Sequence, residues 1–543
     1  MPTAHTDRFV LERLPHGDAL PDFRFDHPTL HFPERLNAAS ALLAGGDRHA
    51  IALRWPGGAW TYAELAQTTD RICGGLRDLG VVPGGRIVLR GKNGPMLCAL
   101  WLAAVKIGAV VVVTMPMLRT RELAFVLRKT QPALCLVEAD LEPELMAAAE
   151  EVGHGRTIIG YSLDGRGDQE LERRLRHQPD QAEATDTYAT DPALIAFTSG
   201  TTGDPKATVH FHRDVLTIAD GFPRSLLDTR ADDIFLCSAP MGFTFGLGAH
   251  LVFPLRHGAS ALLLSNAAPD KLFDAMEEHR PTIVMTAPTA YRAMTARAAT
   301  ADLSSVRRFV SAGEHLPAAS WNAWKAATGA SIINGIGSTE MLHIFASTQP
   351  DRDEPGATGR AVPGYQVCVL RPDLRLALPG EIGQLAVKGP TGCRYLEDER
   401  QANYVRGGWN LTGDAYSIDE TGCLWFAGRA DDMIISSGYN ISGREVEESV
   451  LRHEAVQECA VVASPDPDRG TVVKAYVVLT PGQTADAALA RSIQDFVKVD
   501  IAPFKYPRAV EFLSALPRNA SGKVQRFVLR DQAAMRPEHS EGS

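Results

Sequence analysis

The sequence predicts an α/β protein whose large N-terminal part is built from βαβ units with mostly parallel sheets. Through the first 330 residues, short apolar runs alternate with longer amphipathic segments. An example is the helix-like YAELAQTTDRICGGLRDLG (62–80), which is followed by the strand-like RIVLRG (86–91). Such alternation is typical of parallel sheets covered by helices. Hydrophobic residues make up 45% of the 543 residues, so the chain can bury a large core, and its length suggests two to four domains.

The next elements follow the same alternation. The span MLCALWLAAVKIGAVVVVTMPM (96–117) is apolar enough to be weighed as a membrane helix, but Lys106 interrupts it and a β-branched run begins at Val110. We therefore expect a buried helix that leads into a buried parallel strand. Further strands are expected at ALCLVEA, ASALLLS, TIVMTAP and RRFVSAGE, and further helices at DKLFDAMEEHR and AYRAMTARAA.

The character of the sequence changes near residue 355. GRAVPGYQVCVL, GEIGQLAVKGP and GCLWFAGR have the form of short strands with Gly and Pro turns, which predicts a small β lobe. A charged stretch, GRADDMIISSGYNISG, then leads into a helix and a strand in REVEESVLRHEAVQECAVVAS. KAYVVLT, RSIQDFVKVDI and AVEFLSALP complete a smaller α+β domain. We place the boundary near 430, which gives domains of residues 1–430 and 431–543.

Composition argues against several classes of partner. The net charge of −10 opposes broad binding to nucleic acid or to an anionic membrane. The eight cysteines include no CxxC pair and lie mostly in apolar runs, which favours buried free thiols in a reducing compartment. The start MPTAHTDRFV lacks the basic-then-apolar pattern of a signal peptide. We therefore expect a soluble, cytoplasmic protein.

One stretch, FTSGTTGDPKATVHFH (197–212), is rich in small residues where a strand ends. Glycines let backbone N–H groups turn inward, hydroxyls add donors and Lys206 adds a positive charge, which together suit a polyphosphate. The spacing is not that of the P-loop, because Asp-Pro separates Gly203 from Lys206. A flexible surface loop of small residues is the alternative.

This stretch resembles the signature loop of the acyl-adenylate-forming (AMP-binding) superfamily, which includes acyl-CoA synthetases, luciferases and adenylation domains. Four more segments agree with that family in order: GIGSTE (335–340), WNLTGD (409–414), GRADDMIISSGYNISGREVE (428–447) and PRNASGK (517–523). The family forms an acyl-adenylate from a carboxylic acid and ATP, with Mg²⁺, and then a thioester with coenzyme A.

The resemblance implies a role for each matching residue. Lys523, Thr339 and Glu340 would be catalytic, with Lys523 at the carboxylate and α-phosphate and Glu340 holding Mg²⁺. SAGEHLP (311–317) would line the adenine pocket, where Ile336 replaces the family's stacking aromatic residue. The ATP-binding residues would be Thr198, Ser199, Gly200, Thr201, Thr202, Gly203, Lys206, Gly313, Glu314, Ile336, Asp414 and Arg429.

The second half-reaction, by the same resemblance, needs a mobile C-terminal domain. In this family the C-terminal lobe rotates about a hinge residue, withdraws the lysine and presents a new face to the adenylate. Asp431 matches the hinge position. Gly438 matches the glycine beside the tunnel for the pantetheine arm of CoA, where a side chain would obstruct the thiol.

Two segments are more specific, because GIGSTEMLHIF (335–345) and FTFGLGAHLVF (243–253) resemble those of the benzoate and 2-aminobenzoate CoA ligases. Carried over, the aryl-acid pocket would have Gly337 as a slot for a planar ring, with aromatic side chains packing on its faces and His343 offering a polar contact. Buried core residues are the alternative interpretation. The pocket residues would be Thr244, Phe245, Phe253, Gly337, His343 and Ile344.

The sequence therefore predicts an aryl-CoA ligase, with 2-aminobenzoate first and benzoate or salicylate next. One alternative is a stand-alone adenylation enzyme that loads an aryl acid onto a carrier protein. Another is a nucleotide-binding regulatory protein that has lost catalysis, against which stand the retained Lys523, Glu340 and Asp414. The partners expected are the aryl acid, ATP and CoA, and either a monomer or a homodimer is compatible with the sequence.

Overall fold

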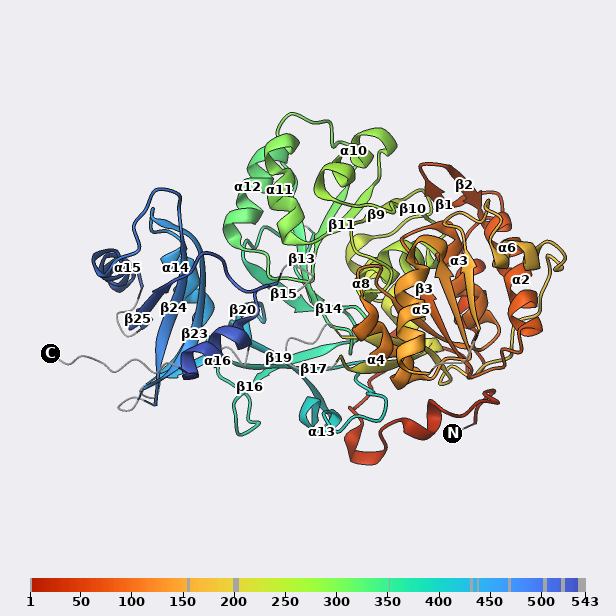
Figure 1. Ribbon diagram of the computed structural model, residues 1–543, viewed down its shortest axis with the longest axis horizontal. Coiled ribbons are helices and arrows are strands. Elements are labelled where there is room, and N and C mark those ends of the chain that lie inside the picture. Colours follow the sequence, from red (N-terminus) through yellow and green to blue (C-terminus); the bar gives the residue numbers. More distant parts are fainter. Residues whose placement is uncertain are drawn as a thin grey trace. The chain divides into compact units, whose positions relative to one another are not determined.

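The computed structural model describes residues 2–153, 157–198, 205–350, 352–429, 433–436, 439–466, 470–501, 505–518 and 523–535 (Figure 1). The chain divides into two compact units. The predicted boundary falls on residues 430–432, which lie outside the described residues, so it stays a prediction. Unit 1 comprises Met1–Ser199, Pro205–Val367 and Val387–Asn410, and unit 2 comprises Gly200–Asp204, Cys368–Ala386 and Leu411–Ser543.

The first sheet of unit 1 has the strand order β6-β5-β3-β4-β7-β8. Neighbouring strands are parallel except β7 and β8, which are antiparallel. This confirms the largely parallel sheet that the alternating sequence predicts. The strands are β3 (Arg86–Arg90), β4 (Val110–Thr114), β5 (Leu134–Glu138), β6 (Ile158–Tyr161), β7 (Pro192–Phe197) and β8 (Ala207–Phe211).

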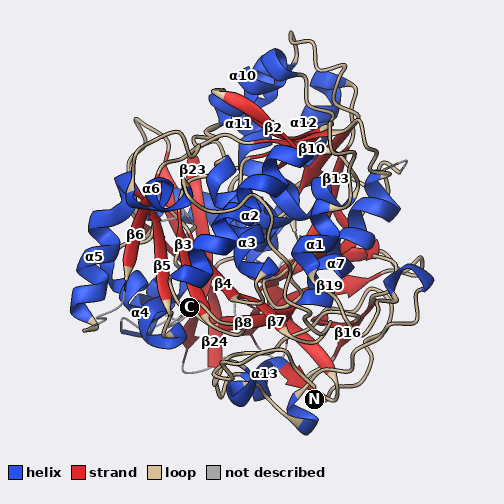
Figure 2. Cartoon of the chain, turned by 90° about the vertical axis from the view of Figure 1, so that its right-hand side faces the viewer, coloured by secondary structure: helices blue, strands red, loops and turns tan. Residues whose placement is uncertain are grey.

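Helices cover both faces of this sheet, as Figure 2 shows. One core cluster joins alternate residues of β3, β4 and β5, such as Val88 and Val112, to helices α4 (Thr120–Thr130) and α5 (Glu142–Glu151). The other face meets α3 (Pro95–Lys106), beside α2 (Tyr62–Asp78). Pro95 to Val105 of α3 are all buried, which confirms the predicted buried helix before β4. In the described part of the chain, no helix is both long and apolar enough for a membrane span.

The second sheet of unit 1 carries the loops that matter for the site. Its order is β2-β1-β10-β9-β11-β12-β13-β14-β15, and β10, β9, β11, β12 and β13 run parallel to one another. Loops at the carboxyl ends of such strands usually form the ligand crevice. The elements are β1 (Ile51–Trp55), β2 (Gly58–Thr61), β9 (Ile234–Cys237), β10 (Ser260–Leu262), β11 (Ile283–Thr286), β12 (Arg308–Ser311), β13 (Ile332–Gly337), β14 (Ile344–Ser347), β15 (Ala357–Ala361), α10 (Pro269–His279), α11 (Pro288–Ala298) and α12 (Ala318–Thr328).

The predicted β lobe is present as β16 (Gln366–Leu370), β17 (Gly383–Lys388), β19 (Trp409–Ile418) and β20 (Leu424–Arg429). The charged stretch that follows contains an unpredicted antiparallel hairpin of β21 (Met433–Ser436) and β22 (Tyr439–Ser442). The apolar residues of this stretch form only short runs interrupted by serines, so the pattern of alternating residues that indicates a strand could not be recognised in the sequence.

The C-terminal part of unit 2 is the expected α+β arrangement. A three-stranded sheet of β23 (Val456–Asp466), β24 (Gly470–Leu479) and β25 (Ala509–Phe512) has helices on both faces. Val461 and Val473 pack with α14 (Gly443–Val450) and α15 (Ala487–Asp500), whereas the alternate residues pack with α16 (Arg526–Met535). This two-sided burial follows from the period-two alternation of side chains along a strand.

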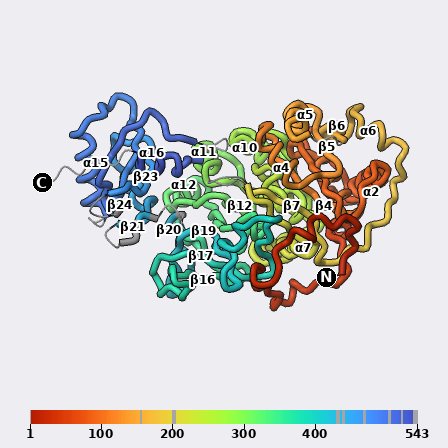
Figure 3. Tube along the Cα trace, turned by 60° about the horizontal axis from the view of Figure 1, so that its bottom comes forward, coloured from red at the N-terminus to blue at the C-terminus, as the bar shows by residue number. Residues whose placement is uncertain are grey.

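The N-terminal segment lies along residues 388–410 of unit 1, as Figure 3 shows for the red and turquoise segments. The Asp22 N–H donates to the Gly408 carbonyl at 2.9 Å, and Phe23 forms a parallel bridge with Gly389. The Gln401 side chain donates to the Ala19 carbonyl at 2.8 Å. Residues from the two ends of unit 1 therefore form one packed layer.

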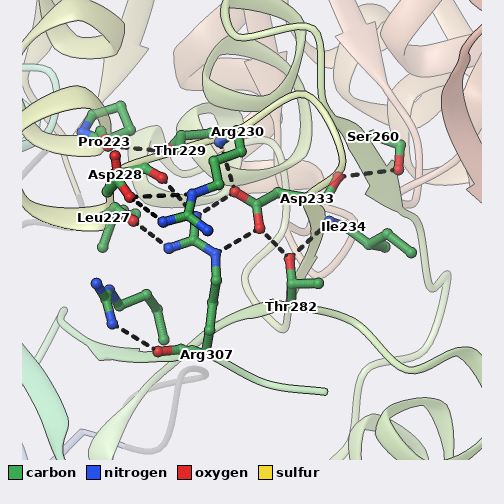
Figure 4. Close-up of polar contacts among 11 residues, drawn as sticks. Pro223, Leu227, Asp228, Thr229, Arg230, Asp233, Ile234, Ser260, Thr282 and Arg307 are labelled. Carbon is green, nitrogen blue, oxygen red and sulfur yellow. Dashed lines mark hydrogen bonds and ion pairs between the residues drawn. The ribbon is translucent and has the colours of Figure 1, made fainter.

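A buried ion pair fixes the amino ends of β9, β11 and β12 (Figure 4). Asp233 is 2% exposed and is held by Arg307, by the Thr282 hydroxyl at 2.6 Å and by the Arg230 N–H at 2.7 Å. Arg307 also donates to the carbonyls of Leu227 at 2.6 Å and Asp228 at 2.9 Å. Burial opposes the charge of Asp233, but these donors outweigh it and hold its pKa below the ordinary value of 3.8.

Replacing Arg307 by leucine is expected to lower the free energy of unfolding by about 3–5 kcal/mol, because Asp233 would remain buried without its cation. Thermal melting should detect the loss, and Arg128→Leu, which breaks the exposed pair with Glu151, should cost about 1 kcal/mol or less. A depressed carboxyl pKa stabilises the fold above the unfolded pKa and loses that effect as the pH falls. The difference between wild type and variant should therefore shrink below about pH 4, and a difference independent of pH would contradict this account.

Candidate active site

The ends of the glycine-rich loop are held together in unit 1. The Thr198 N–H donates to the Lys206 carbonyl at 2.9 Å, and the Lys206 N–H donates to the Thr198 hydroxyl at 3.2 Å. This extends the β7–β8 ladder to the edge of the loop and leaves both residues half-buried. Of the predicted phosphate-binding residues, Ser199, Gly200, Thr201, Thr202 and Gly203 lie outside the described residues.

The loop after β13 brings two predicted catalytic residues next to β8. The Thr339 carbonyl accepts a hydrogen bond from His210 Nε2 at 2.8 Å. Glu340, only 7% exposed, accepts a hydrogen bond on Oε1 from the Tyr395 hydroxyl at 2.5 Å. Burial, together with the Glu340 carboxylate, raises the pKa of Tyr395 far above its usual value, so the phenol remains protonated. Lys206 Nζ lies 5.2 Å from the centre of the Tyr395 ring, so residues of the first and second nucleotide motifs converge.

The residue next to Tyr395 in the chain, Arg394, belongs to a buried charged cluster. Arg394 Nη1 donates to Asp214 Oδ2 at 2.8 Å, and both side chains are at most 2% exposed. Burial disfavours the Asp214 carboxylate, but the charge of Arg394 outweighs that effect and holds its pKa well below the ordinary range. The Arg394 guanidinium lies 4.2 Å from the ring centre of Phe23 and 4.0 Å from that of Phe211. Sequence reasoning missed His210, Asp214, Arg394 and Tyr395.

The other predicted nucleotide contacts lie in different places. Gly313 and Glu314 are exposed in the loop after β12, and Gly313 has a φ of +87°, which glycine adopts without strain. Ile336 is half-buried on β13.

The remaining predicted residues belong to unit 2. Asp414 on β19 pairs in register with Arg429 at the end of β20, and Lys523 is exposed just before α16. Asp431 and Gly438 lie outside the described residues.

Three of the predicted aryl-acid residues, Phe245, Phe253 and His343, form an aromatic cluster in unit 1, whereas Thr244 is half-buried at the start of α8 (Thr244–Leu247) and Ile344 is buried on β14. The His343 ring stacks on Phe245 with centroids 5.5 Å apart and meets Phe253 edge-on at 4.5 Å. Phe222, which sequence reasoning missed, lies 6.2 Å from His343 in a stacked orientation. Phe245 lies on α8, and a π-helical turn, Gly248–Val252, connects it to Phe253 at the start of α9 (Phe253–Arg256). Such turns often occur at functional sites.

His343 is neutral inside this cluster. Burial lowers its pKa to about 3, and the backbone carbonyl of Phe245 acts in the opposite direction. Within the described part of the chain, neither ring nitrogen has a partner in hydrogen-bonding geometry. The arrangement therefore offers an apolar, aromatic surface that includes one neutral polar group.

Two glycines set the shape of the cluster. A Cβ at Gly337 would lie 2.7 Å from the backbone of His343, so the absent side chain gives room to the chain's own hairpin. This close approach is enough to explain glycine at 337, and the role of Gly337 as a slot for a planar ring stays a prediction. A Cβ at Gly248 would lie 2.6 Å from the His343 ring and 2.9 Å from Phe253.

The Gly248→Ala variant should disturb the aromatic cluster without straining the backbone, because residue 248 is helical. If the cluster binds the aryl acid as the sequence predicts, the KM for an aryl acid should rise about tenfold or more while the KM for ATP changes little, because a displaced His343 would alter the surroundings of the acid. Gly160→Ala, whose Cβ would meet its nearest neighbour at an ordinary 3.6 Å, is the matched control. Equal changes in both KM values would show a general disturbance of unit 1 instead.

Comparison with known proteins identifies the family. Residues 43–394 match the model of the AMP-binding enzyme family, and residues 445–523 match that of the AMP-binding enzyme C-terminal domain. The chain belongs to the AMP-binding enzyme family.

Individual relatives narrow the class. A benzoate–CoA ligase of Thauera aromatica is 35% identical over 515 residues, which cover 93% of this chain and 97% of the relative. The solved structure of an anthranilate CoA ligase in complex with anthranoyl-AMP is 34% identical, with a TM-score of 0.84 and coverage of 93% and 98%. That of a benzoate CoA ligase from Burkholderia xenovorans LB400 is 33% identical, with a TM-score of 0.79 and coverage of 91% and 99%. These likenesses place the protein among the AMP-forming acid–thiol ligases.

Proposed function

We propose that this protein is an ATP-dependent aryl-acid CoA ligase. 2-Aminobenzoate is the first candidate substrate, and benzoate and salicylate are the next. The observation that carries the proposal is the aromatic cluster in which half-buried Phe245 and buried Phe253 meet His343, in the same unit as Glu340 and the ends of the glycine-rich loop. Aromatic faces suit a flat ring, and a neutral imidazole whose ring nitrogens have no hydrogen-bond partner among the described residues suits a polar ring substituent. The benzoate and anthranilate ligases among the relatives support the same substrate class.

In the first step, a carboxylate oxygen of the acid attacks the α-phosphorus of ATP. An O–P bond forms as the bond from that phosphorus to pyrophosphate breaks. Both reactants are anionic, so the site must supply donors and positive charge to the transition state. We assign the loop 198–203 and Lys206 to the phosphates and Lys523 to the carboxylate and α-phosphate. Adenine would meet Gly313, Glu314 and Ile336, and the ribose would meet Asp414 and Arg429.

Glu340 and Thr339 fit a site for Mg²⁺ carried by ATP. Mg²⁺ takes oxygen ligands and is usually held by one or two carboxylates together with substrate phosphates. Glu340 is such a carboxylate, and no group of three or more metal-binding side chains occurs among the described residues. When bound, the ion would neutralise negative charge on the phosphates. Glu340 would hold the ion, and Thr339 precedes Glu340 in the same loop.

In the second step, the thiol sulfur of CoA forms a bond to the acyl carbon and releases its proton to solvent, while the bond from that carbon to the phosphate oxygen breaks and AMP leaves with its electrons. We assign residues 431–543 to a mobile domain that turns about Asp431, and Gly438 to the passage for the thiol. A stand-alone enzyme that loads a carrier protein would share the first step and differ only in this acceptor.

The test is a pyrophosphate-release assay with ATP and Mg²⁺, run with benzoate, 2-aminobenzoate, salicylate, a fatty acid and an amino acid, with and without CoA. We expect turnover confined to the aryl acids and dependent on CoA. If an aryl adenylate forms but does not react with CoA, the acceptor would instead be a carrier protein. No release with any aryl acid would refute the assignment of the aromatic cluster.

A further inference from the structure

Residues 394–396 form a short strand-like partner of β8. The Val209 N–H donates to the Arg394 carbonyl at 2.9 Å, and the Leu396 N–H donates to the Ala207 carbonyl at 2.8 Å. Successive side chains of an extended segment point to opposite sides. Arg394 accordingly binds the buried Asp214, while Tyr395 reaches the Glu340 carboxylate.

The same strand holds the residue that precedes Glu340. A carbonyl can only accept, so His210 Nε2 donates to the Thr339 oxygen at 2.8 Å. Thr339 and Glu340 are thus held at two points, by β8 and by its partner segment. Because β8 begins at the residue after Lys206, Lys206 and the loop that bears Glu340 are both held by the same strand.

The Glu340 carboxylate is engaged on one side only. Tyr395 donates to Oε1 at 2.5 Å, and among the described residues Oε2 has no hydrogen-bond partner. A hydrogen bond to a charged group is stronger than one between neutral groups, and here it lies in a buried setting. One oxygen is therefore fixed and the other stays available.

We propose that Tyr395 is a positioning residue for adenylation, which fixes Oε1 of Glu340 so that Oε2 can bind the metal of Mg·ATP. This inference rests on the proposed function. It assigns Tyr395 a role that runs through Glu340 alone and requires no contact between Tyr395 and substrate. The metal of Mg·ATP would then meet a Glu340 carboxylate whose orientation is already fixed before ATP binds.

The Tyr395→Phe variant isolates this role, because the ring has its own packing. It meets the Tyr404 ring edge-on at 5.8 Å and lies beneath Lys206. Phenylalanine keeps the ring and removes one hydroxyl. The matched control is Tyr62→Phe, which removes an equally buried hydroxyl that donates to the Ala259 carbonyl at 2.8 Å, away from these residues.

The experiment is calorimetric titration of each protein with ATP, with and without Mg²⁺, together with pyrophosphate-release kinetics. We expect Tyr395→Phe to bind Mg·ATP about 10- to 100-fold more weakly, with metal-free ATP unchanged and with a lower kcat. In a Glu340→Gln background the same change should have little further effect, because the hydroxyl acts through the carboxylate. Tyr62→Phe should leave the metal dependence intact.

Unchanged Mg·ATP affinity in Tyr395→Phe would overturn the inference, as would a full additional loss in the Glu340→Gln background. Equal losses with and without Mg²⁺ would also overturn it, because they would indicate a general disturbance of the site. A wild-type protein without aryl-dependent pyrophosphate release would instead refute the proposed function, while the ATP titrations would still decide the role of Tyr395.

Discussion

Replacing Lys523 by alanine is expected to slow adenylate formation by about 10²–10³-fold, the usual cost of removing one group that stabilises developing charge. Lys523 is exposed beside α16, so its loss should have little effect on stability. The proposed role concerns the first half-reaction only. Synthetic aryl adenylate supplied with CoA should therefore still be converted to thioester at a rate close to that of the wild type.

Measuring the two half-reactions separately distinguishes a role of Lys523 in adenylation from a general effect on the protein. Lys498→Ala is the matched control, since Lys498 is a lysine of the same domain that pairs with Asp495 on α15. If both half-reactions slow equally in Lys523→Ala, the residue supports the fold of unit 2 and not the adenylation step. Unchanged adenylation would remove Lys523 from the site.

The Glu340→Gln variant should show the second large effect, a fall of about 10²-fold or more in pyrophosphate release. The amide keeps the shape of the side chain, and its oxygen can still accept from Tyr395, so the loop after β13 should retain its place. What is lost is the negative charge for a divalent cation. Pyrophosphate-release rates measured over a range of Mg²⁺ concentrations should show that the variant loses more activity, relative to the wild type, at low Mg²⁺.

A carboxylate of equal burial supplies the control. Glu172, also 7% exposed, accepts hydrogen bonds from Ser162 at 2.8 Å and has no part in the proposed site. Glu172→Gln should reduce stability at most. Similar kinetic losses in the two variants, or a Glu340→Gln deficit that does not depend on Mg²⁺, would show that Glu340 is only a core carboxylate.

Local patterns were sufficient to predict most of the fold. The β-branched run after Lys106 marked the change from α3 to β4, and the alternation of apolar and amphipathic segments predicted the parallel sheets. The apolar run before the glycine-rich stretch also predicted that Thr198 follows a strand, as it does after β7. These features depend on residues close together in the chain, which is why sequence reasoning could reach them.

The supporting contacts could not be predicted, because their members are distant in sequence and ordinary in type. His210 lies within an apolar strand, where its side chain gives no sign of a partner at Thr339. Phe222 joins Phe245 and His343 only after three separate segments have folded together. The reason for glycine at 337 is a close approach of its own hairpin backbone, which no local pattern encodes.

The layer formed by the N-terminal segment and residues 388–410 has a consequence for synthesis on the ribosome. Ala19 is synthesised 382 residues before its hydrogen-bond partner Gln401. Asp214 is synthesised 180 residues before its ion-pair partner Arg394. Until then, Asp214 lacks the buried guanidinium of Arg394 at 2.8 Å and has only the more distant Arg213 at 3.8 Å. Unit 1 therefore can complete its folding only when residue 410 has left the exit tunnel, and a chain whose translation stalls earlier is expected to lack these contacts.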